Sequence, residues 1–344
     1  MPALLPEGIG YFTVADAEVF AGAVALLNSL RLTGHREPLV VLDAGLTGAQ
    51  REILGRHCAV APWSAETPGH PTLHKPFPRL LRTEGTLVFL DSDLIVTRSL
   101  RPIVVAAEAG NICAFPDPDS SRFFSAWREL FGLQNAPRRQ TYVSAHFLAF
   151  STDHWPDLLP RWWEACELIF DRAILGSRNR GDPAYAGDQD ALNALLMSEV
   201  PRDALKLLPA RERATGPSQA RSTSIIDRRS LACAIDGTPT TVIHIGGKPV
   251  PKPWQEEALR RIRWDAYVRL LRRLLHGDDV TLRYPETERL PVWLRKGALG
   301  ALSLRGVAAL NAVRAPAVRM ATARRLHEPV YVWLRSAWRA RRAN

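Results

Sequence analysis

Two acidic side chains that directly follow an apolar run are the first candidates for chemistry in this sequence. Residues 86–90 read Thr-Leu-Val-Phe-Leu, which is typical of a short buried strand. Asp91 and Asp93 come next, before a second apolar run at 94–96. Carboxylates beside a buried strand are costly unless positive charge compensates for them. A hard divalent cation would do so and would keep coordination positions free for phosphate oxygens. The pattern predicts a metal site; the alternative is a solvated turn.

A second acidic group begins a helix. Residues 187–193 read Gly-Asp-Gln-Asp-Ala-Leu-Asn, and acids in the first turn of a helix are favoured by its macrodipole. This segment is either a simple helix start or a place where Asp188 and Gln189 point into a ligand site.

A histidine ends the last apolar run of the main body, at residues 240–243. Two glycines and two lysines follow His244 within eight residues: Gly246, Gly247, Lys248 and Lys252. Glycine lets the backbone approach a ligand closely, and lysine binds phosphate as a point charge. A histidine after an apolar run is usually structural, but this combination favours a ligand histidine followed by a phosphate-binding turn.

Alternating strand and helix patterns must position these side chains. The expected elements are strands at 11–14 and 38–42 and helices at 17–32 and 47–56. This order predicts an α/β protein with a mostly parallel, Rossmann-like sheet and helices on both faces. Ligands bind such sheets at the C-terminal ends of the strands. Asp16 and Asp91 both follow strands, so we expect one crevice to receive both.

The other segments have simpler patterns. Residues 57–85 contain many Pro and Gly and are expected to wrap the sheet edge. We further expect strands at 112–115 and 142–150, a Trp-rich helix at 155–170, and an irregular loop or lid at 210–230. Asp117 and Asp119 form a third Asp-x-Asp pair, which flanking prolines mark as part of a loop.

Composition limits the class of protein. The 344 residues are 46% hydrophobic and 23% charged, as in an ordinary globular chain with one large domain and an appendage. The four cysteines are scattered without a C-x-x-C pair, which predicts buried thiols in a reducing compartment. The N-terminal residues do not have the pattern of a signal peptide, and no apolar run reaches the length of a membrane span.

Positive charge is concentrated at the C-terminus. Residues 289–344 contain 12 Lys or Arg and one acid, whereas the first 288 contain 33 basic and 34 acidic residues. A near-neutral body argues against nucleic-acid binding, and the tail predicts an anionic partner of its own. Prolines divide the tail into short helix candidates that also contain Trp293, Tyr331, Trp333 and Trp338. Basic residues with interfacial aromatics are typical of segments that lie on an anionic membrane surface, although a helical cap on the body is the alternative.

Five segments, taken together, resemble family 8 of the retaining glycosyltransferases, the glycogenin and bacterial lipopolysaccharide galactosyltransferase group with a GT-A fold. They are Thr13–Asp16, Leu87–Val96, Tyr142–Trp155, Asp188–Asn193 and His244–Trp254. Two positions depart from the family pattern. Ser144-Ala145-His146 stands where Asn-Ala-Gly is usual, which leaves the donor sugar open. Lys252-Pro253-Trp254 is displaced by two residues, so Lys248 competes with Lys252 for the diphosphate.

The resemblance implies a role for each candidate residue. A nucleotide-sugar donor, most simply a UDP-hexose, would bind with Mn²⁺ or Mg²⁺ held by Asp91, Asp93 and His244. Asp188 would position the donor sugar, and Gln189 would lie near the reacting carbon. The nucleoside and diphosphate would contact the remaining candidates, Ala15, Asp16, Lys75, Ser92, Gly246, Gly247, Lys248 and Lys252.

We therefore expect a catalytic domain at residues 1–255, a helical extension at 256–288 and a basic tail at 289–344. The expected function is transfer of a hexose to a saccharide or lipid-linked acceptor, in lipopolysaccharide or surface polysaccharide synthesis. The expected location is the cytoplasmic face of a bacterial membrane. A catalytically silent membrane-attached scaffold is the main alternative, and a nucleotidyltransferase is the weaker one.

Overall fold

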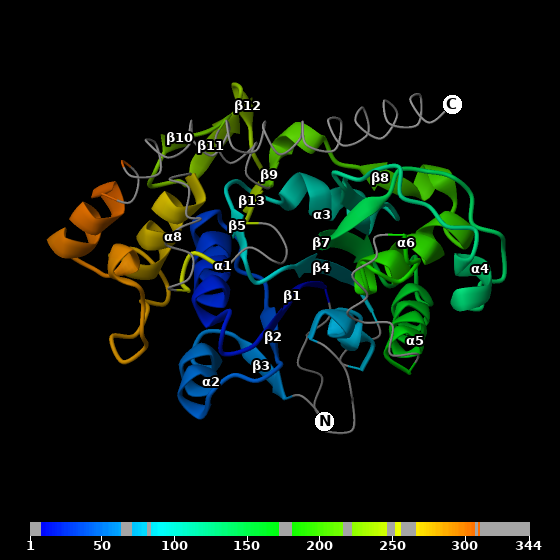
Figure 1. The fold of residues 1–344 in the computed structure, drawn as a ribbon, viewed down its shortest axis with the longest axis horizontal. Helices are drawn as coiled ribbons and strands as arrows, with labels where there is room; N and C mark the ends of the chain where they lie inside the picture. The colour runs from blue at the N-terminus through cyan, green and yellow to red at the C-terminus, as the bar shows by residue number, and fades with distance from the viewer. Residues whose placement is uncertain are drawn as a thin grey trace, which may run out of the picture.

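The structure is a computed structural model in which a central sheet lies between two layers of helices (Figure 1). It describes residues 8–62, 71–80, 84–171, 181–215, 222–245, 252–255, 266–306 and 309.

Seven strands form the central sheet. In spatial order they are β3 (Ala59–Pro62), β2 (Leu39–Asp43), β1 (Ile9–Ala15), β4 (Thr86–Leu90), β7 (Val143–Ser151), β6 (Ile112–Pro116) and β8 (Leu205–Leu207). β7 is antiparallel to both of its neighbours, and the other adjacent pairs are parallel. The predicted α/β class with a mostly parallel sheet is confirmed.

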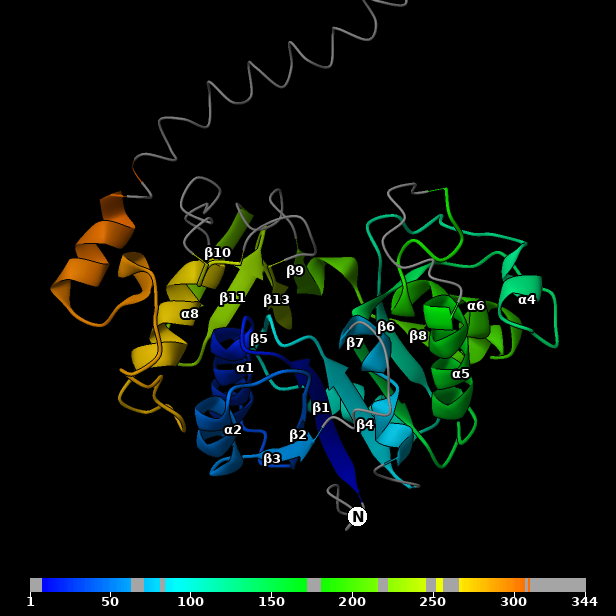
Figure 2. The same ribbon diagram turned by 60° about the horizontal axis from the view of Figure 1, so that its bottom comes forward.

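Helices cover both faces of this sheet, as Figure 2 shows from a second direction, and both faces are buried. Val88 and Leu90 of β4 pack in a hydrophobic cluster with α1 (Phe20–Leu32) and α3 (Arg101–Glu108). Leu87 and Phe89, which alternate with them, pack in a second cluster with α5 (Leu158–Asp171) and α6 (Asp188–Ser198). The short helices α2 (Gly48–Gly55) and α4 (Trp127–Leu130) join the first and second clusters, respectively. Burial on both faces explains the continuous apolar run of β4.

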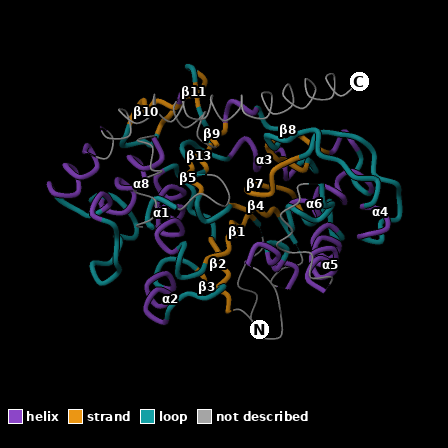
Figure 3. Tube along the Cα trace, viewed as in Figure 1, coloured by secondary structure: helices purple, strands orange, loops and turns teal. Residues whose placement is uncertain are grey.

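Two three-stranded sheets lie beside the central one, as the strand segments in Figure 3 show. One contains β5 (Leu94–Val96), β13 (Val242–His244) and β9 (Arg213–Thr215), and the other contains β10 (Thr223–Asp227), β11 (Ala232–Ile235) and β12 (Thr238–Pro239). The expected loop at 210–230 is therefore wrong in part, because β9 and β10 lie within it. The short 3₁₀ helices are η1 (Pro71–His74), η2 (Phe77–Leu80), η3 (Arg202–Ala204), η4 (Ala210–Glu212) and η6 (Val292–Leu294).

The helix starts differ from the sequence predictions where side chains or proline impose a turn. α1 begins at Phe20 rather than residue 17, because Oδ1 of Asp16 accepts hydrogen bonds from the backbone N–H groups of Glu18 and Val19. α5 begins at residue 158 rather than 155. Pro156 follows Trp155, and a proline disfavours helical geometry at the residue before it. Thr47 caps the start of α2 in a reciprocal capping box with Gln50.

The segment after the closing motif packs on the core. α8 (Ala266–His276) lies against α1, where the Asn28 side chain bonds the backbone of Leu274 and Leu282. Trp293 is also buried, and its Nε1 donates to the carbonyl of Pro253 at 2.8 Å. Counting Trp293 among interfacial aromatics was therefore wrong. In the described part of the chain, no helix is long and apolar enough to cross a bilayer.

Candidate active site

Asp91, Asp93 and His244 meet at the C-terminal end of β4. Asp91 and Asp93 occupy the turn between β4 and β5, which is fixed by a hydrogen bond from Leu94 N to the Asp91 carbonyl. β13 pairs antiparallel with β5, and this register sets His244 opposite Leu94. Strand pairing thus joins residues that are about 150 positions apart in the sequence.

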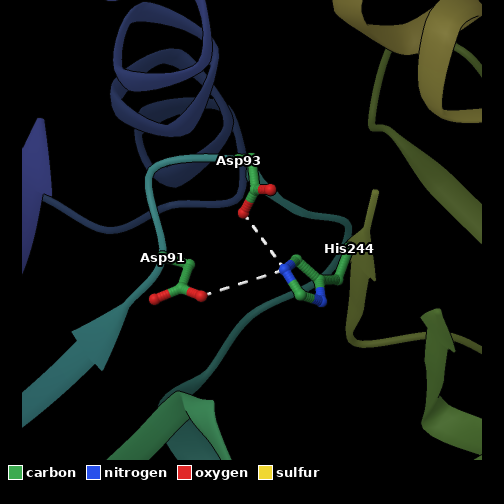
Figure 4. Close-up of side chains that lie close together, drawn as sticks. All are labelled: Asp91, Asp93 and His244. Carbon is green, nitrogen blue, oxygen red and sulfur yellow. Dashed lines mark ion pairs between the residues drawn. The ribbon is translucent and has the colours of Figure 1, made fainter. Parts of the chain in front are cut away.

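The three side chains converge on one point (Figure 4). His244 Nε2 lies 3.1 Å from Asp93 Oδ1 and 3.8 Å from Asp91 Oδ2. One ligand atom from each residue falls within 4.8 Å of the others. Two carboxylates and an imidazole at this separation fit a divalent ion such as Mn²⁺ or Mg²⁺. The predicted residues of the metal site are brought together.

Lys252 pairs with Asp93 in the same group. Its Nζ contacts Oδ2 of Asp93, while Oδ1 of Asp93 faces His244. Burial raises the pKa of Asp93, but His244 and Lys252 outweigh this effect and hold the pKa well below its usual value. Asp93 is therefore a buried carboxylate that stays ionised because the Lys252 ammonium group and the His244 ring both contact it.

Lys75 joins the metal group to the start of α6. Its Nζ lies 2.8 Å from Asp91 Oδ1, 3.1 Å from Asp188 Oδ2 and 3.0 Å from the carbonyl of Ala145. The ammonium group therefore forms ion pairs with both carboxylates and donates a hydrogen bond to the Ala145 carbonyl, while Asp188 Oδ2 accepts no hydrogen bond from any described residue. Burial raises the pKa of Asp188 to about 6, although Lys75 opposes the shift. Lys75 was predicted as a donor-site residue, but its link to both carboxylates was not visible in the sequence.

Gln189 is held in a fixed orientation. Its Oε1 accepts from Ala145 N at 3.0 Å, and its Nε2 donates to Asp117 Oδ2 at 3.1 Å. The Ser144 hydroxyl donates to the same Asp117 oxygen at 2.6 Å. Sequence analysis assigned Asp117 to a loop and missed this contact. Its place after the C-terminal end of β6 was the available signal.

The rest of the Asp-Gln-Asp-x-Leu-Asn segment anchors α6. Asp190 is fully buried and accepts two hydrogen bonds from Arg122, each 2.7 Å long, and one from the Tyr142 hydroxyl. The Asn193 side chain bonds both backbone polar groups of Val143 on β7. These contacts hold α6 so that Asp188 and Gln189 face the site.

Two further buried side chains, the imidazole of His146 and the guanidinium of Arg213, lie behind His244. The His146 ring stacks on the His244 ring, and Arg213 Nη1 lies 3.4 Å from His146 Nε2. Burial lowers the pKa of Arg213 to about 10, and burial with the neighbouring His244 and Arg213 lowers that of His146 well below its usual value. The sequence marked position 146 only as a departure from the family pattern, and Arg213 was missed within the expected loop.

The candidates near β1 lie on the adjacent strand end. Ala15 is buried at the end of β1, and Asp16 follows it in the turn before α1. Ser92 is buried between the two metal-site carboxylates, and its carbonyl lies so close to α1 that a Cβ on Gly22 would be 2.5 Å from it. Gly22 therefore allows α1 to approach the Asp91–Asp93 turn.

The closing motif is described only in part. Gly246, Gly247 and Lys248 lie outside the described residues. Lys252 is described, and Trp254, two residues further on, is buried with its Nε1 donating to the Glu18 carbonyl. This contact fixes the position from which Lys252 reaches Asp93.

Comparison with known proteins identifies the fold. No family model and no curated protein matches the sequence. Among solved structures, the chain is similar to the galactosyltransferase LgtC in complex with donor and acceptor sugar analogs, with a TM-score of 0.52 and 18% identity over 81% of this chain and 98% of that one. It is also similar to the bifunctional glycosyltransferase WbbM, with a TM-score of 0.50 and 13% identity over 82% of this chain and 51% of that one.

The fold is of the GT-A type. The expected GT-A architecture of the main body is confirmed, and assignment to family 8 stays a prediction. In this GT-A sheet the Asp91–Asp93 turn follows β4, the strand between β1 and β7.

Proposed function

We propose that this GT-A chain is a metal-dependent glycosyltransferase that moves a hexose from a nucleotide sugar, most simply a UDP-hexose, to a saccharide or lipid-linked acceptor. The observation that carries the proposal is the convergence of Asp91, Asp93 and His244 beside two lysines, at the C-terminal edge of the sheet. The activity of the two structural neighbours supports it. A place in lipopolysaccharide or surface polysaccharide synthesis in a bacterium belongs to the same proposal.

The reaction breaks the bond between the sugar carbon and the diphosphate oxygen, and the electron pair leaves with the phosphate. A metal ion held by Asp91, Asp93 and His244 would supply positive charge at that oxygen. Lys252 lies beside Asp93 and is suited to bind the same diphosphate, because a lysine binds phosphate as a point charge.

Asp188 and Gln189 differ in what they can offer to the sugar. Asp188 is a buried carboxylate that can accept hydrogen bonds from hydroxyl groups. Gln189 has an amide, which is a poor covalent nucleophile, and both of its polar atoms are already bonded. Retention, which the resemblance to family 8 implies, would therefore proceed by attack on the same face, with the proton of the acceptor hydroxyl passing to the departing phosphate oxygen.

The test is a panel of nucleotide sugars with the purified full chain, with Mn²⁺, with Mg²⁺ and with EDTA. Thermal shift identifies the donor that binds, and release of the nucleoside diphosphate measures its consumption. We expect one sugar nucleotide to raise Tm only with metal present and to be consumed. Consumption that is unaffected by EDTA would contradict metal dependence.

A catalytically silent binding protein is the second candidate. The observation that favours it is that Lys75 and Lys252 already neutralise Asp91 and Asp93. Binding of a nucleotide sugar without hydrolysis or transfer, for any acceptor tested, would support this reading instead.

We also propose that the tail attaches the protein to an anionic membrane surface on the cytoplasmic side. Most of residues 289–344 lie outside the described part. Within it, four cations are exposed, and Leu299 and Leu302 are 69% and 63% exposed on the helical segment 298–306. The exposed cations are Arg289, Arg295, Lys296 and Arg305. Exposed leucines among cations suit the interface of an anionic bilayer, where a lipid-linked acceptor would be found.

A further inference from the structure

We propose that His146 and Arg213 position the imidazole of His244 for metal binding. The inference rests on the proposed function, which makes His244 a metal ligand. His146 and Arg213 would be positioning residues that lie behind the metal group. Among the described residues, neither forms a hydrogen bond or ion pair with Asp91 or Asp93.

The stack fixes the tilt of the His244 ring. The centroids of the His146 and His244 rings are 4.5 Å apart, and the ring planes differ by 10°. The Phe115 ring is also nearly parallel to His146, at 6.4 Å and 8°. Because the His146 ring lies parallel to the His244 ring at this separation, the His244 ring cannot tilt out of its plane. Only rotation within that plane remains.

Contacts at the ring edge fix that remaining rotation. Nε2 of His244 faces Asp93, and Nδ1 lies 3.4 Å from the Thr215 hydroxyl. Thr215 is placed there because β9 pairs in parallel with β13 and sets it opposite His244. An Nδ1–H bonded to Thr215 leaves the Nε2 lone pair directed toward the carboxylates, as metal ligation requires.

Arg213 holds His146 in the stacking position. Its Nη1 donates to His146 Nε2, and its Nη2 donates to the Pro116 carbonyl at 2.7 Å. Arg213 is only 2% exposed, and among the described residues it has no carboxylate within ion-pair distance and no acceptor for Nε, although Asp117 attracts it from further away. Burying a cation without a direct ion-pair partner is costly. A site chosen for packing alone would be filled at lower cost by an apolar side chain.

The alternative is that His146 only fills space, and substitutions separate the two roles. His146→Phe keeps a flat ring, whereas His146→Leu has bulk without one. We would measure Mn²⁺ binding to the full chain without donor, by calorimetry. We expect His146→Leu to weaken Mn²⁺ binding about tenfold with little change in Tm. His146→Phe and Arg213→Met each remove the contact between Arg213 and His146 but keep a flat ring beside His244, so both should stay within about threefold of the wild type. The matched control is His154→Leu, because His154 is exposed and, among the described residues, its ring bonds only the Glu108 carbonyl.

A second measurement does not depend on metal. In the full chain labelled with ¹³C at histidine Cε1, the His244 signal is assigned from its loss in His244→Ala. We expect one sharp signal in the wild type and in His146→Phe, and a broadened or divided signal in His146→Leu. An unchanged His244 signal and Mn²⁺ affinity in His146→Leu, or a His146→Phe variant as impaired as His146→Leu, would overturn the inference. If the wild type bound no Mn²⁺, the metal part of the proposed function would fail, while the His244 signal would still decide the positioning role.

Discussion

Lys252 and Asp93 form an ion pair inside the group that is suited to hold a metal. The lysine therefore occupies one oxygen of a candidate ligand in the protein without a donor. A diphosphate that attracts Lys252 would release this carboxylate oxygen. Binding of the donor and of the metal should consequently favour each other, beyond any direct contact between them.

Replacing Lys252 tests this coupling. Lys252→Ala should raise the donor KM and lower kcat, because a cation at the diphosphate is lost. The same change should strengthen Mn²⁺ binding without donor, or leave it unchanged, because a competing cation is removed from Asp93. Calorimetry with Mn²⁺ and steady-state kinetics measure the two effects. A larger kinetic loss in Lys248→Ala would reverse the assignment of the diphosphate lysine.

Replacing the metal-site residues should abolish transfer and leave the fold intact. Asp91→Asn, Asp93→Asn and His244→Ala each remove a ligand, so we expect a loss of transfer of at least about a hundredfold, since metal charge stabilisation is worth several kcal/mol. Circular dichroism and Tm serve as controls for folding. Full activity in EDTA would disprove the metal role of all three residues.

The order of strands and helices could be predicted because its signals are local. The apolar run at 86–90 is buried on both faces as β4, and Asp91 and Asp93 follow it as expected. His244 was found because an apolar run, a histidine and glycines stand together. In each case a short stretch of sequence contains the whole pattern.

The remaining parts of the site depend on distant contacts. Arg213 acts on His146 from a three-residue strand whose pairing with β13 decides its position. Asp117 gains its role only because α6 brings Gln189 to it. The sequence predicted Trp293 as an interfacial residue because it lies in a segment rich in basic residues, but its side chain packs on the core. Strand pairing and helix packing, rather than local pattern, set these positions.

The raised pKa of Asp188 predicts a pH dependence of sugar recognition. In the proposed donor complex the ionised carboxylate would accept hydrogen bonds from sugar hydroxyls, so donor affinity should fall as the pH drops below about 6. The Asp188→Asn variant is the matched control, and its affinity for the UDP-hexose should lack this acid limb. Calorimetric Kd values of the UDP-hexose for the wild type and the variant between pH 5 and 8 measure the difference. Parallel curves would remove Asp188 from the sugar contact.

The raised pKa of Asp188 also makes the free energy of unfolding depend on pH. The direction is opposite to that of an ion-paired acid, whose pKa is lowered by folding. The pKa of Asp188 is 3.8 when unperturbed and about 6 when folded, so the folded state binds more protons between these values. Its contribution to the free energy of unfolding should therefore decrease as pH rises from about 4 to 6. Asp188→Asn should remove this slope in urea unfolding curves.

Removing Arg122 should destabilise the protein strongly. Its side chain is 8% exposed and bonds Asp190, which is 0% exposed, so Arg122→Ala leaves a buried carboxylate without its cation. Loss of one partner of a buried pair costs about 3–5 kcal/mol. Urea unfolding measures it, and Arg128→Ala, at an exposed arginine on α4, is the control. Equal stability of the two variants would contradict the anchoring role given to Asp190.

Membrane attachment by residues 289–344 can be tested with a shortened chain that keeps the buried residues of this segment. Leu290, Leu294 and Leu304 are buried, so ending the chain near residue 288 would expose apolar surface. A chain ending after Gly306 keeps these residues and removes eight of the twelve cations in 289–344. At about 1 kcal/mol per cation near an anionic surface, this loss should reduce binding to anionic liposomes by several orders of magnitude.

Co-sedimentation with anionic and neutral liposomes at two salt concentrations measures the effect. The full chain should bind the anionic liposomes, and salt should weaken binding because it screens the cations. In the full chain, Leu299→Ser with Leu302→Ser should weaken binding further, since these exposed leucines would enter the interface. Equal binding by the full and shortened chains, or binding that ignores lipid charge, would show that the tail does not attach the protein to a membrane.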